Sequence, residues 1–208
     1  RTPLTTFRLY SDMLSAGLVP EDVKQEYLDT LNRESQRLST LVEAVLEYAR
    51  LENHKVKLNI AQTDPAALLR VLSGTLEQRC EKHGVQPQTE SHVPDSHPMR
   101  TDVNLVNQIA AVLVDNACRH AKTSKTPRIR LQLAGDNGHL HLDVIDSGPG
   151  VELADARRIF KPFRRGKDAD VSARGGVGLG LALARNWATL LGGRLDLVAR
   201  HDAQLGGR

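Results

Sequence analysis

The sequence predicts an α+β protein, in which a helical hairpin precedes a domain of mixed helices and strands. Apolar residues recur every seven positions through the first part of the chain, as in a helical bundle. From about residue 54 onward, amphipathic helical segments alternate with short stretches of period-two alternation, which is typical of strands. With 40% hydrophobic residues, the 208-residue chain can bury the core of one or two domains. We place the hairpin at residues 1–53 and the second domain at residues 54–208.

The hairpin is predicted from a break between two helical stretches. The segment AGLVPED (16–22) contains Gly17 and Pro20, which interrupt a helix. No second hairpin of this kind follows in the sequence, so its apolar stripe needs a partner. We therefore expect a homodimer through residues 1–53, forming a four-helix bundle. The stripe consists of Leu28, Ser35, Val42 and Ala49, together with Leu31, Leu38 and Val45.

The second domain is expected to begin with a strand in VKLNI (56–60), followed by a helix that Asp64 caps and Pro65 starts. Residues 84–101 contain three prolines and are expected to be irregular. Asp102 then starts a second helix.

Two alternating segments, 129–133 and 140–144, flank the turn GDNG and predict a β-hairpin. A last helix is expected over 179–191, then a strand in RLDLVA (194–199). Because the chain stops at LGGR, after a turn signal, a further strand is expected beyond it.

Charge and cysteine content exclude several classes of protein. The 28 basic and 25 acidic residues are interspersed, which argues against a nucleic-acid partner. Cys80 and Cys118 lie in helical segments and are expected to be buried free thiols of a reducing compartment. No apolar run reaches the length of a membrane span, so any membrane contact is expected through parts outside this sequence.

The stretch DSGPG (146–150) follows an apolar strand. A carboxylate at Asp146 can accept a hydrogen bond from an exocyclic amine such as that of adenine, and Gly148 and Gly150 permit close approach of a ligand. Taken alone, a plain turn explains the stretch equally well.

The stretch GGVGLGLAL (175–183) places alternate glycines, Gly176, Gly178 and Gly180, ahead of a helix. Backbone N–H groups at a helix start suit phosphate oxygens. The stretch lacks the Lys-Ser/Thr of a P-loop. A flexible hinge is the alternative interpretation.

The stretch DNACRHA (115–121) lies on a helix. The amide oxygen of Asn116 can ligate Mg²⁺, and Arg119 can meet phosphate charge. A surface Asn and Arg is the alternative. The segment IFKPFRRG (159–166) adds positive charge beside the glycines, as a nucleoside triphosphate requires. The polar segment 164–175 is expected to form a lid.

These stretches follow one another 30 residues apart, from Asn116 to Asp146 and from Asp146 to Gly176. In combination they resemble the sensor histidine kinases of bacterial two-component systems. DNACRHA is similar to the N box, DSGPG to the first glycine box, IFKPFRRG to the F box and GGVGLGLAL to the second glycine box. YARLE (48–52) resembles the end of the second dimerisation helix.

The resemblance implies a dimeric helical hairpin followed by an α/β sandwich of the Bergerat (GHKL) type that binds ATP and Mg²⁺. It implies that Asn116 binds the metal and that Asp146 reads adenine. Arg119 and Arg165 would face the phosphates. The nucleotide would also be lined by Gly148, Gly150, Gly176, Gly178, Leu179 and Gly180.

The resemblance further implies a phosphoryl transfer from ATP to a helix histidine and on to an aspartate in the receiver domain of a response regulator. Thr2, Pro3 and Leu4 match the end of the family motif His-Glu-x-x-Thr-Pro-Leu, so the acceptor histidine is expected four residues before Thr2. Thr2 itself would orient water in the reverse reaction, dephosphorylation of the regulator. This part of the protein is expected in the cytoplasm, with any inner-membrane anchor elsewhere in the parent.

One position departs from the family pattern. The family usually has an Asn four residues before the metal-binding Asn, and Val112 stands there. Two alternatives therefore stay open. The chain can be a degenerate kinase that binds nucleotide as a dimeric scaffold. It can also be an ATPase of the same nucleotide fold, as in gyrase B or MutL, although the hairpin and YARLE disfavour that interpretation.

Overall fold

The computed structural model describes residues 3–52, 57–93, 99–136, 139–152, 155–156, 158–163 and 178–198. The chain divides into two compact units, residues 1–55 and residues 56–208. The first unit is all helical within its described residues, and the second mixes helices with two sheets. This order of a helical hairpin and an α+β domain confirms the predicted fold class.

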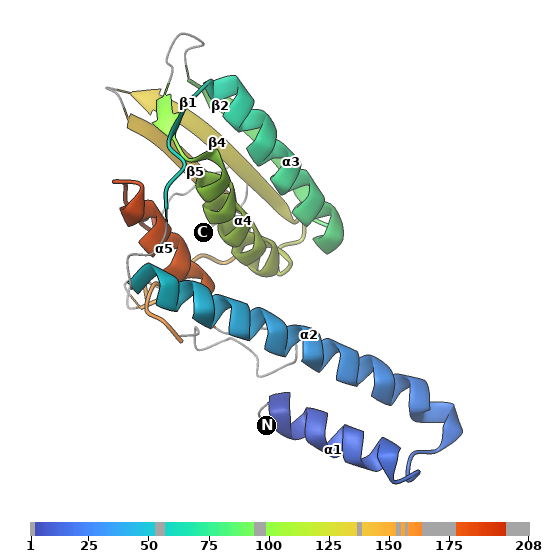
Figure 1. The fold of residues 1–208 in the computed structure, drawn as a ribbon. Helices are drawn as coiled ribbons and strands as arrows, with labels where there is room; N and C mark the ends of the chain where they lie inside the picture. Colours follow the sequence, from blue (N-terminus) through green and yellow to red (C-terminus); the bar gives the residue numbers. More distant parts are fainter. Residues whose placement is uncertain are drawn as a thin grey trace. The chain divides into compact units, whose positions relative to one another are not determined.

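The first unit is a hairpin of α1 (Pro3–Ser15) and α2 (Glu21–Glu52), which Figure 1 shows packed against each other. Gly17 turns the chain with a φ of 66°, a left-handed conformation that glycine adopts readily. The rings of Tyr10 and Tyr27 stack with their centroids 4.4 Å apart and fix how the two helices meet. The acidic residues Glu21 and Asp22 occupy the first turn of α2, where their negative charge interacts favourably with the helix dipole.

Much of the apolar stripe of α2 is left uncovered by α1. Leu28, Val42 and Val45 of this stripe, and Leu46 beside it, are each at least 40% exposed. Among the described helices, none is long and apolar enough to cross a membrane. The stripe therefore forms an exposed apolar surface on the single hairpin.

The second unit contains a three-stranded sheet in the order β2–β4–β5. Strand β2 (Gln86–His92) runs parallel to β4 (Arg128–Asp136), and β5 (His139–Asp146) runs antiparallel to β4. A separate antiparallel pair joins β1 (Ala61–Thr63) to β3 (Met99–Thr101). The expected β-hairpin of β4 and β5 is confirmed.

Two helices, α3 (Pro65–His83) and α4 (Val103–Ala121), lie side by side on one face of the three-stranded sheet (Figure 1). Helix α5 (Gly180–Leu190) lies next to α4. The core fills the space between α3, α4 and β4 because each element turns one apolar face inward. Its central members are Leu68, Leu72, Leu76, Val106, Ala110, Val114, Ile129, Leu131 and Leu133.

Both predicted helix starts are confirmed by their capping geometry. The Asp64 side chain accepts a hydrogen bond from the Ala66 N–H at 3.2 Å. The Asp102 carboxylate accepts from the Leu105 N–H at 3.1 Å through one oxygen and from the Asn59 N–H at 2.8 Å through the other. Asp102 is only 7% exposed. Because it bonds both N–H groups, its side chain joins the segment before β1 to the start of α4.

Three sequence predictions about strands are wrong. Residues 57–60 are not a strand, because the Asn59 N–H bonds the Asp102 carboxylate instead of a neighbouring strand. Residues 86–92 and 99–101 form β2 and β3 and are not irregular. Residues 194–198 are not a strand, and Leu197 and Val198 are 42% and 61% exposed. Residue 199 and the expected strand beyond it lie outside the described residues.

Candidate nucleotide-binding site

The turn after β5 is held by its own side chains. Asp146 is the last residue of β5, and its Oδ1 accepts a hydrogen bond from the Gly148 N–H at 2.7 Å. Between them, the buried Ser147 accepts a hydrogen bond from the Arg128 N–H at 3.0 Å through its hydroxyl. One carboxylate oxygen thus shapes the turn, while the carboxylate's further acceptor capacity suits a ligand amine.

Gly148 packs directly against the end of α4. A Cβ on this residue would lie 2.6 Å from Asp146 Oδ1 and 3.0 Å from the carbonyl carbon and oxygen of His120. Only glycine fits this space without a shift of the backbone. The end of the DNACRHA stretch and the DSGPG turn therefore lie in contact. Gly150, with a φ of 78°, turns the chain away immediately afterwards.

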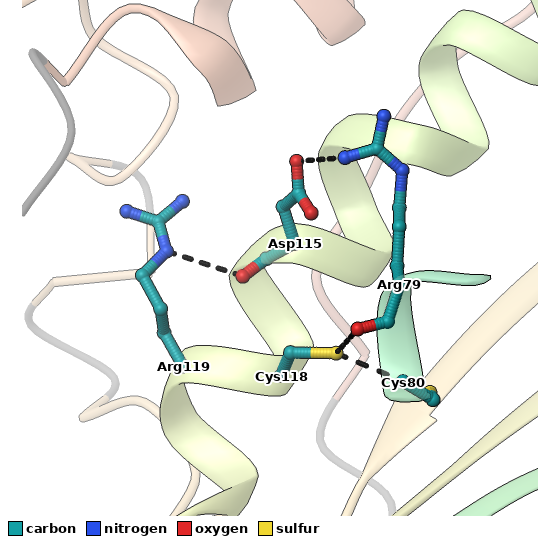
Figure 2. Close-up of polar contacts among 5 residues, drawn as sticks. All are labelled: Arg79, Cys80, Asp115, Cys118 and Arg119. Atoms are coloured by element: carbon teal, nitrogen blue, oxygen red, sulfur yellow. Dashed lines mark hydrogen bonds and ion pairs between the residues drawn. The ribbon is translucent and has the colours of Figure 1, made fainter. Parts of the chain in front are cut away.

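Helix α4 carries Asn116 and Arg119. Asn116 is half-buried, and Arg119 is exposed. The Arg119 Nε–H donates to the Asp115 carbonyl at 3.1 Å, one turn earlier on the same helix. Figure 2 shows that the terminal nitrogens of Arg119 point away from this carbonyl. They are the donors with which Arg119 can reach a phosphate.

An ion pair between Arg79 of α3 and Asp115 of α4 stands beside Arg119 (Figure 2). This pair occupies the Asp115 carboxylate, so the acid next to Asn116 is engaged with α3. At the end of α3, burial lowers the pKa of His83, and the nearby Lys122 lowers it further. The lowered pKa favours the neutral form of His83, and the cations around it are Lys82, Arg119 and Lys122.

The start of α5 is the third part of the site. Gly178 has a φ of 77°, and no side chain caps the helix. The first N–H groups of an uncapped helix lack intrahelical partners and suit phosphate oxygens. Gly180 faces α4, because a Cβ there would lie 3.2 Å from Val112 Cγ1. Val112 thus packs against the second glycine stretch instead of presenting a polar group.

The F-box segment is tied to the same glycines. The Phe163 N–H donates to the Gly178 carbonyl at 3.0 Å, and Phe163 has a left-handed φ of 59°. Phe160 lies under the Arg185 guanidinium of α5, which is 5.2 Å from the ring centre. The segment IFKPF therefore contacts both the residue Gly178 ahead of α5 and the middle of that helix.

The structure thus brings together the elements that carry most of the residues predicted for the site. Gly148 contacts the end of the helix that carries Asn116 and Arg119, and Gly180 contacts Val112 on that same helix. Leu179 is 1% exposed and belongs to the core beneath the site. Thr2, Arg165 and Gly176 lie outside the described residues, as does the predicted lid at 164–175.

Three polar contacts around the site were not predicted from the sequence. The second role of Asp102, the Arg79–Asp115 pair and the Phe163–Gly178 hydrogen bond all join residues far apart in the chain. Periodicity gives no signal for such pairs. The dipeptide Pro162–Phe163 ahead of a glycine-rich stretch was a weak hint of a turn at that point.

Comparison with known proteins places this arrangement in a family. Residues 101–207 match the profile described as histidine kinase-, DNA gyrase B-, and HSP90-like ATPase. Residues 1–54 match the histidine kinase A (phospho-acceptor) domain. The second unit is therefore a GHKL-type ATPase domain. Because the first unit is a phospho-acceptor domain, the chain belongs to the bacterial two-component sensor histidine kinases.

Individual relatives agree with this assignment. The sensor protein SphS of Synechococcus elongatus is 33% identical over the whole chain and 50% of its own length. The sensor protein PfeS of Pseudomonas aeruginosa is 34% identical over 94% of the chain and 41% of its own length. The chain thus spans half or less of these curated relatives.

Solved structures show the same fold. The histidine kinase AdeS of Acinetobacter baumannii is 25% identical and superposes with a TM-score of 0.68, covering 91% of this chain and 84% of its own. The histidine kinase ThkA, solved in complex with the response regulator TrrA, gives a TM-score of 0.72 at 20% identity, over 96% of this chain and 55% of its own.

Proposed function

We propose that the chain is the kinase core of a two-component sensor and binds ATP with Mg²⁺ between the end of β5, α4 and the start of α5. The observation that carries this proposal is the turn in which Asp146 and Gly148 close against the end of α4. That turn leaves a carboxylate at a strand end, beside a helix with an amide and a guanidinium. ShkA, a structure of the same fold at a TM-score of 0.67 and 22% identity, was solved in complex with AMPPNP.

Each residue has a distinct role in this proposal. Asp146 accepts a hydrogen bond from the adenine amine, which guanine does not offer at that position. Gly148 keeps space for the base. Arg119 and Arg165 neutralise the phosphates, and the uncapped start of α5 donates backbone N–H groups to them.

The residues present fit a magnesium ion. Mg²⁺ usually keeps several waters and is held by one or two protein oxygens plus substrate phosphates. Asn116 supplies one neutral oxygen from α4, while the Asp115 carboxylate is paired with Arg79. When bound, the ion supplies charge neutralisation at the phosphate oxygens. Asn116 would hold it, and Arg119 on the same helix would hold the phosphates in place.

The phosphoryl acceptor in this proposal is the histidine that the family motif places four positions ahead of Thr2. The phosphoryl group then passes to an aspartate of a response regulator, as the ThkA complex with a response regulator supports. Thr2 would orient the attacking water when the regulator is dephosphorylated. For these steps the chain supplies positioning and charge neutralisation.

We also propose that the chain dimerises through residues 1–53. Leu28, Val42 and Val45, three of the seven stripe positions, are at least 40% exposed in the single chain, and Leu46 beside them is 53% exposed. A second hairpin packed against this stripe would bury it and complete a four-helix bundle.

The alternative left open by the sequence is a nucleotide-binding scaffold without kinase activity, and neither the structure nor the comparisons favour it. Val112 makes an apolar contact with the start of α5, which is compatible with either function. Both candidates predict ATP binding. Only the kinase predicts transfer to a histidine.

The binding step is tested by calorimetric titration with ATP and with GTP in the presence of Mg²⁺. We expect ATP to bind and GTP to bind far more weakly. Asp146→Ala leaves a ligand donor unpaired, which costs about 1–3 kcal/mol. Its Kd for ATP should rise roughly ten- to a hundred-fold.

The matched control is Asp196→Ala, because Asp196 is an exposed acid of the same unit that pairs with Arg194. It should bind ATP as the unchanged protein does. Equal affinity for ATP and GTP, or no loss in Asp146→Ala, would contradict the adenine assignment.

A further inference from the structure

Two cysteines face each other across the packed helices of the nucleotide-binding unit. Cys80 of α3 and Cys118 of α4 are both fully buried, and their sulfur atoms lie 4.0 Å apart. Figure 2 shows the Cys118 side chain directed at Cys80. A disulfide has a sulfur–sulfur length of about 2.05 Å, so the two atoms need to approach by only about 2 Å. They are the only two cysteines of the sequence.

Two neighbouring contacts between α3 and α4 keep the two sulfur atoms opposite each other. Arg79, next to Cys80, pairs with Asp115, one turn before Cys118. The Cys118 thiol also lies 3.9 Å from the Arg79 carbonyl oxygen. These contacts keep α3 and α4 in register, so the sulfurs stay opposite each other.

Both cysteines stand in the last turn of their helix, since α3 ends at His83 and α4 at Ala121. Both sulfurs belong to the buried core cluster, so an oxidant reaches them through local opening of these two helix ends. A structural metal is a poorer occupant, because the described residues contain no group of three or more His, Cys, Asp or Glu that could hold one.

We propose that Cys80 and Cys118 are an oxidative modification site at which hydrogen peroxide forms a disulfide that locks α3 to α4. One sulfur, as its thiolate, attacks the peroxide oxygen, the O–O bond breaks, and a sulfenic acid and one water form after protonation. The second sulfur attacks the sulfenic sulfur, the S–O bond breaks, and a second water leaves. The two thiols lose two electrons and two protons, which reduce the peroxide.

The bond would act on the nucleotide site through α4. That helix carries Asn116 and Arg119, and the backbone of its residue His120 packs closely against Gly148. Drawing the end of α4 toward α3 moves it away from the Gly148 turn. The oxidised chain should then hold ATP less tightly. This consequence, unlike bond formation itself, rests on the proposed function.

In the first experiment the purified native chain is treated with increasing concentrations of hydrogen peroxide. Reduced glutathione in the same tube is the internal reference, because its oxidation shows that the peroxide was active. Remaining thiols are alkylated after denaturation and counted by intact mass. We expect both thiols to be lost together, with the mass of one disulfide per chain, reversed by dithiothreitol. Non-reducing gels should show no linkage between chains. Two intact thiols when the glutathione is fully oxidised, or linkage only between chains, would overturn the proposal.

The second experiment measures ATP affinity of the reduced and oxidised chain and of Cys80→Ala and Cys118→Ala. We expect a several-fold higher Kd in the oxidised chain, restored by dithiothreitol, and no effect of peroxide on either variant. An unchanged Kd in fully oxidised protein would overturn the coupling to the site. Absence of ATP binding by the reduced chain would instead contradict the proposed function. The disulfide would then be tested by the thiol count of the first experiment alone.

Discussion

Gly148 shows how a single residue can set the geometry of a binding site. Its missing side chain lets the DSGPG turn approach the end of α4 to a distance that no other residue permits. The N–H of the same residue fixes the Asp146 carboxylate at 2.7 Å. The position of Asp146, the residue proposed to read the base, therefore depends on a contact within the protein that does not involve the ligand.

A substitution at Gly148 should consequently affect binding more than folding. In Gly148→Ala the new Cβ meets backbone atoms of His120 and the Asp146 carboxylate, so the turn must shift. We expect ATP affinity to fall by about a hundred-fold or more, equivalent to roughly 3 kcal/mol. Calorimetry with ATP and Mg²⁺ measures the loss.

The matched control is Gly74→Ala on α3, where a Cβ meets nothing within 4 Å. A glycine inside a helix costs up to about 1 kcal/mol relative to alanine, so this variant should be slightly more stable and bind ATP normally. If Gly148→Ala bound ATP as well as Gly74→Ala does, the close approach would be irrelevant to the site.

At the scale of elements, α4 links the site to the rest of the unit. It contacts α3, α5 and two strands of the sheet. Its start is fixed by Asp102, whose two carboxylate oxygens accept from the Leu105 and Asn59 N–H groups. A buried side chain that satisfies two backbone donors stabilises more than a helix cap alone.

Asp102→Ala should therefore destabilise the second unit by roughly 1.5–2.5 kcal/mol, the sum of about 1 kcal/mol for the cap and about 0.5–1.5 kcal/mol for the lost hydrogen bond to the exposed Asn59. Urea denaturation followed by the fluorescence of Trp187, which is buried on α5, reports this unit. Asp64→Ala, which removes the exposed cap of α3, is the control and should cost only about 1 kcal/mol. Equal losses in the two variants would show that the Asn59 contact adds nothing.

The elements that sequence analysis predicted and those that it missed differ in how local their signals are. Asp64 and Asp102 were correctly predicted as helix starts because capping is decided within four residues. Strand β2, QPQTESH, was missed because an edge strand of polar residues shows no hydrophobic alternation. RLDLVA alternates well, but residues 194–198 do not form a strand. A strand requires a neighbour, and alternation alone does not say whether one exists.

The candidate site also combines features that the sequence predicts with features that depend on packing. The sequence predicted which residue types belong to it, through the quoted motifs. It did not predict that Val112 would face Gly180 or that Phe163 would bond Gly178, because those contacts depend on how α4, α5 and the F-box segment pack. The departure at Val112, read from the sequence as a lost ligand, is in the structure an apolar contact between two helices.

At the scale of the whole molecule, the proposed dimer follows from the apolar surface of the hairpin. Val42 is 52% exposed on α2 and belongs to the stripe expected to pack against a second chain. Val42→Glu would place an uncompensated charge in that interface. We expect the dissociation constant of the dimer to rise at least about tenfold, measured by light scattering over a dilution series.

Thr40→Glu is the matched control, because Thr40 is exposed and residues two apart lie on different faces of a helix. It should leave the dimer intact. A monomer in the unchanged protein at micromolar concentration, or dissociation by both variants alike, would contradict an interface on this stripe.

The central claim, that the molecule is a histidine kinase core, is tested most directly by phosphorylation. The test protein is extended upstream to carry the family motif, with a histidine four positions ahead of Thr2. It is incubated with γ-labelled ATP and Mg²⁺. The two controls are the 208-residue chain and the extended protein with that histidine changed to glutamine. We predict an acid-labile label on the extended protein alone. Positioning supplies most of this rate, so another histidine cannot substitute. Label on the 208-residue chain or on the glutamine variant, or no label on an extended protein that binds ATP, would contradict the account.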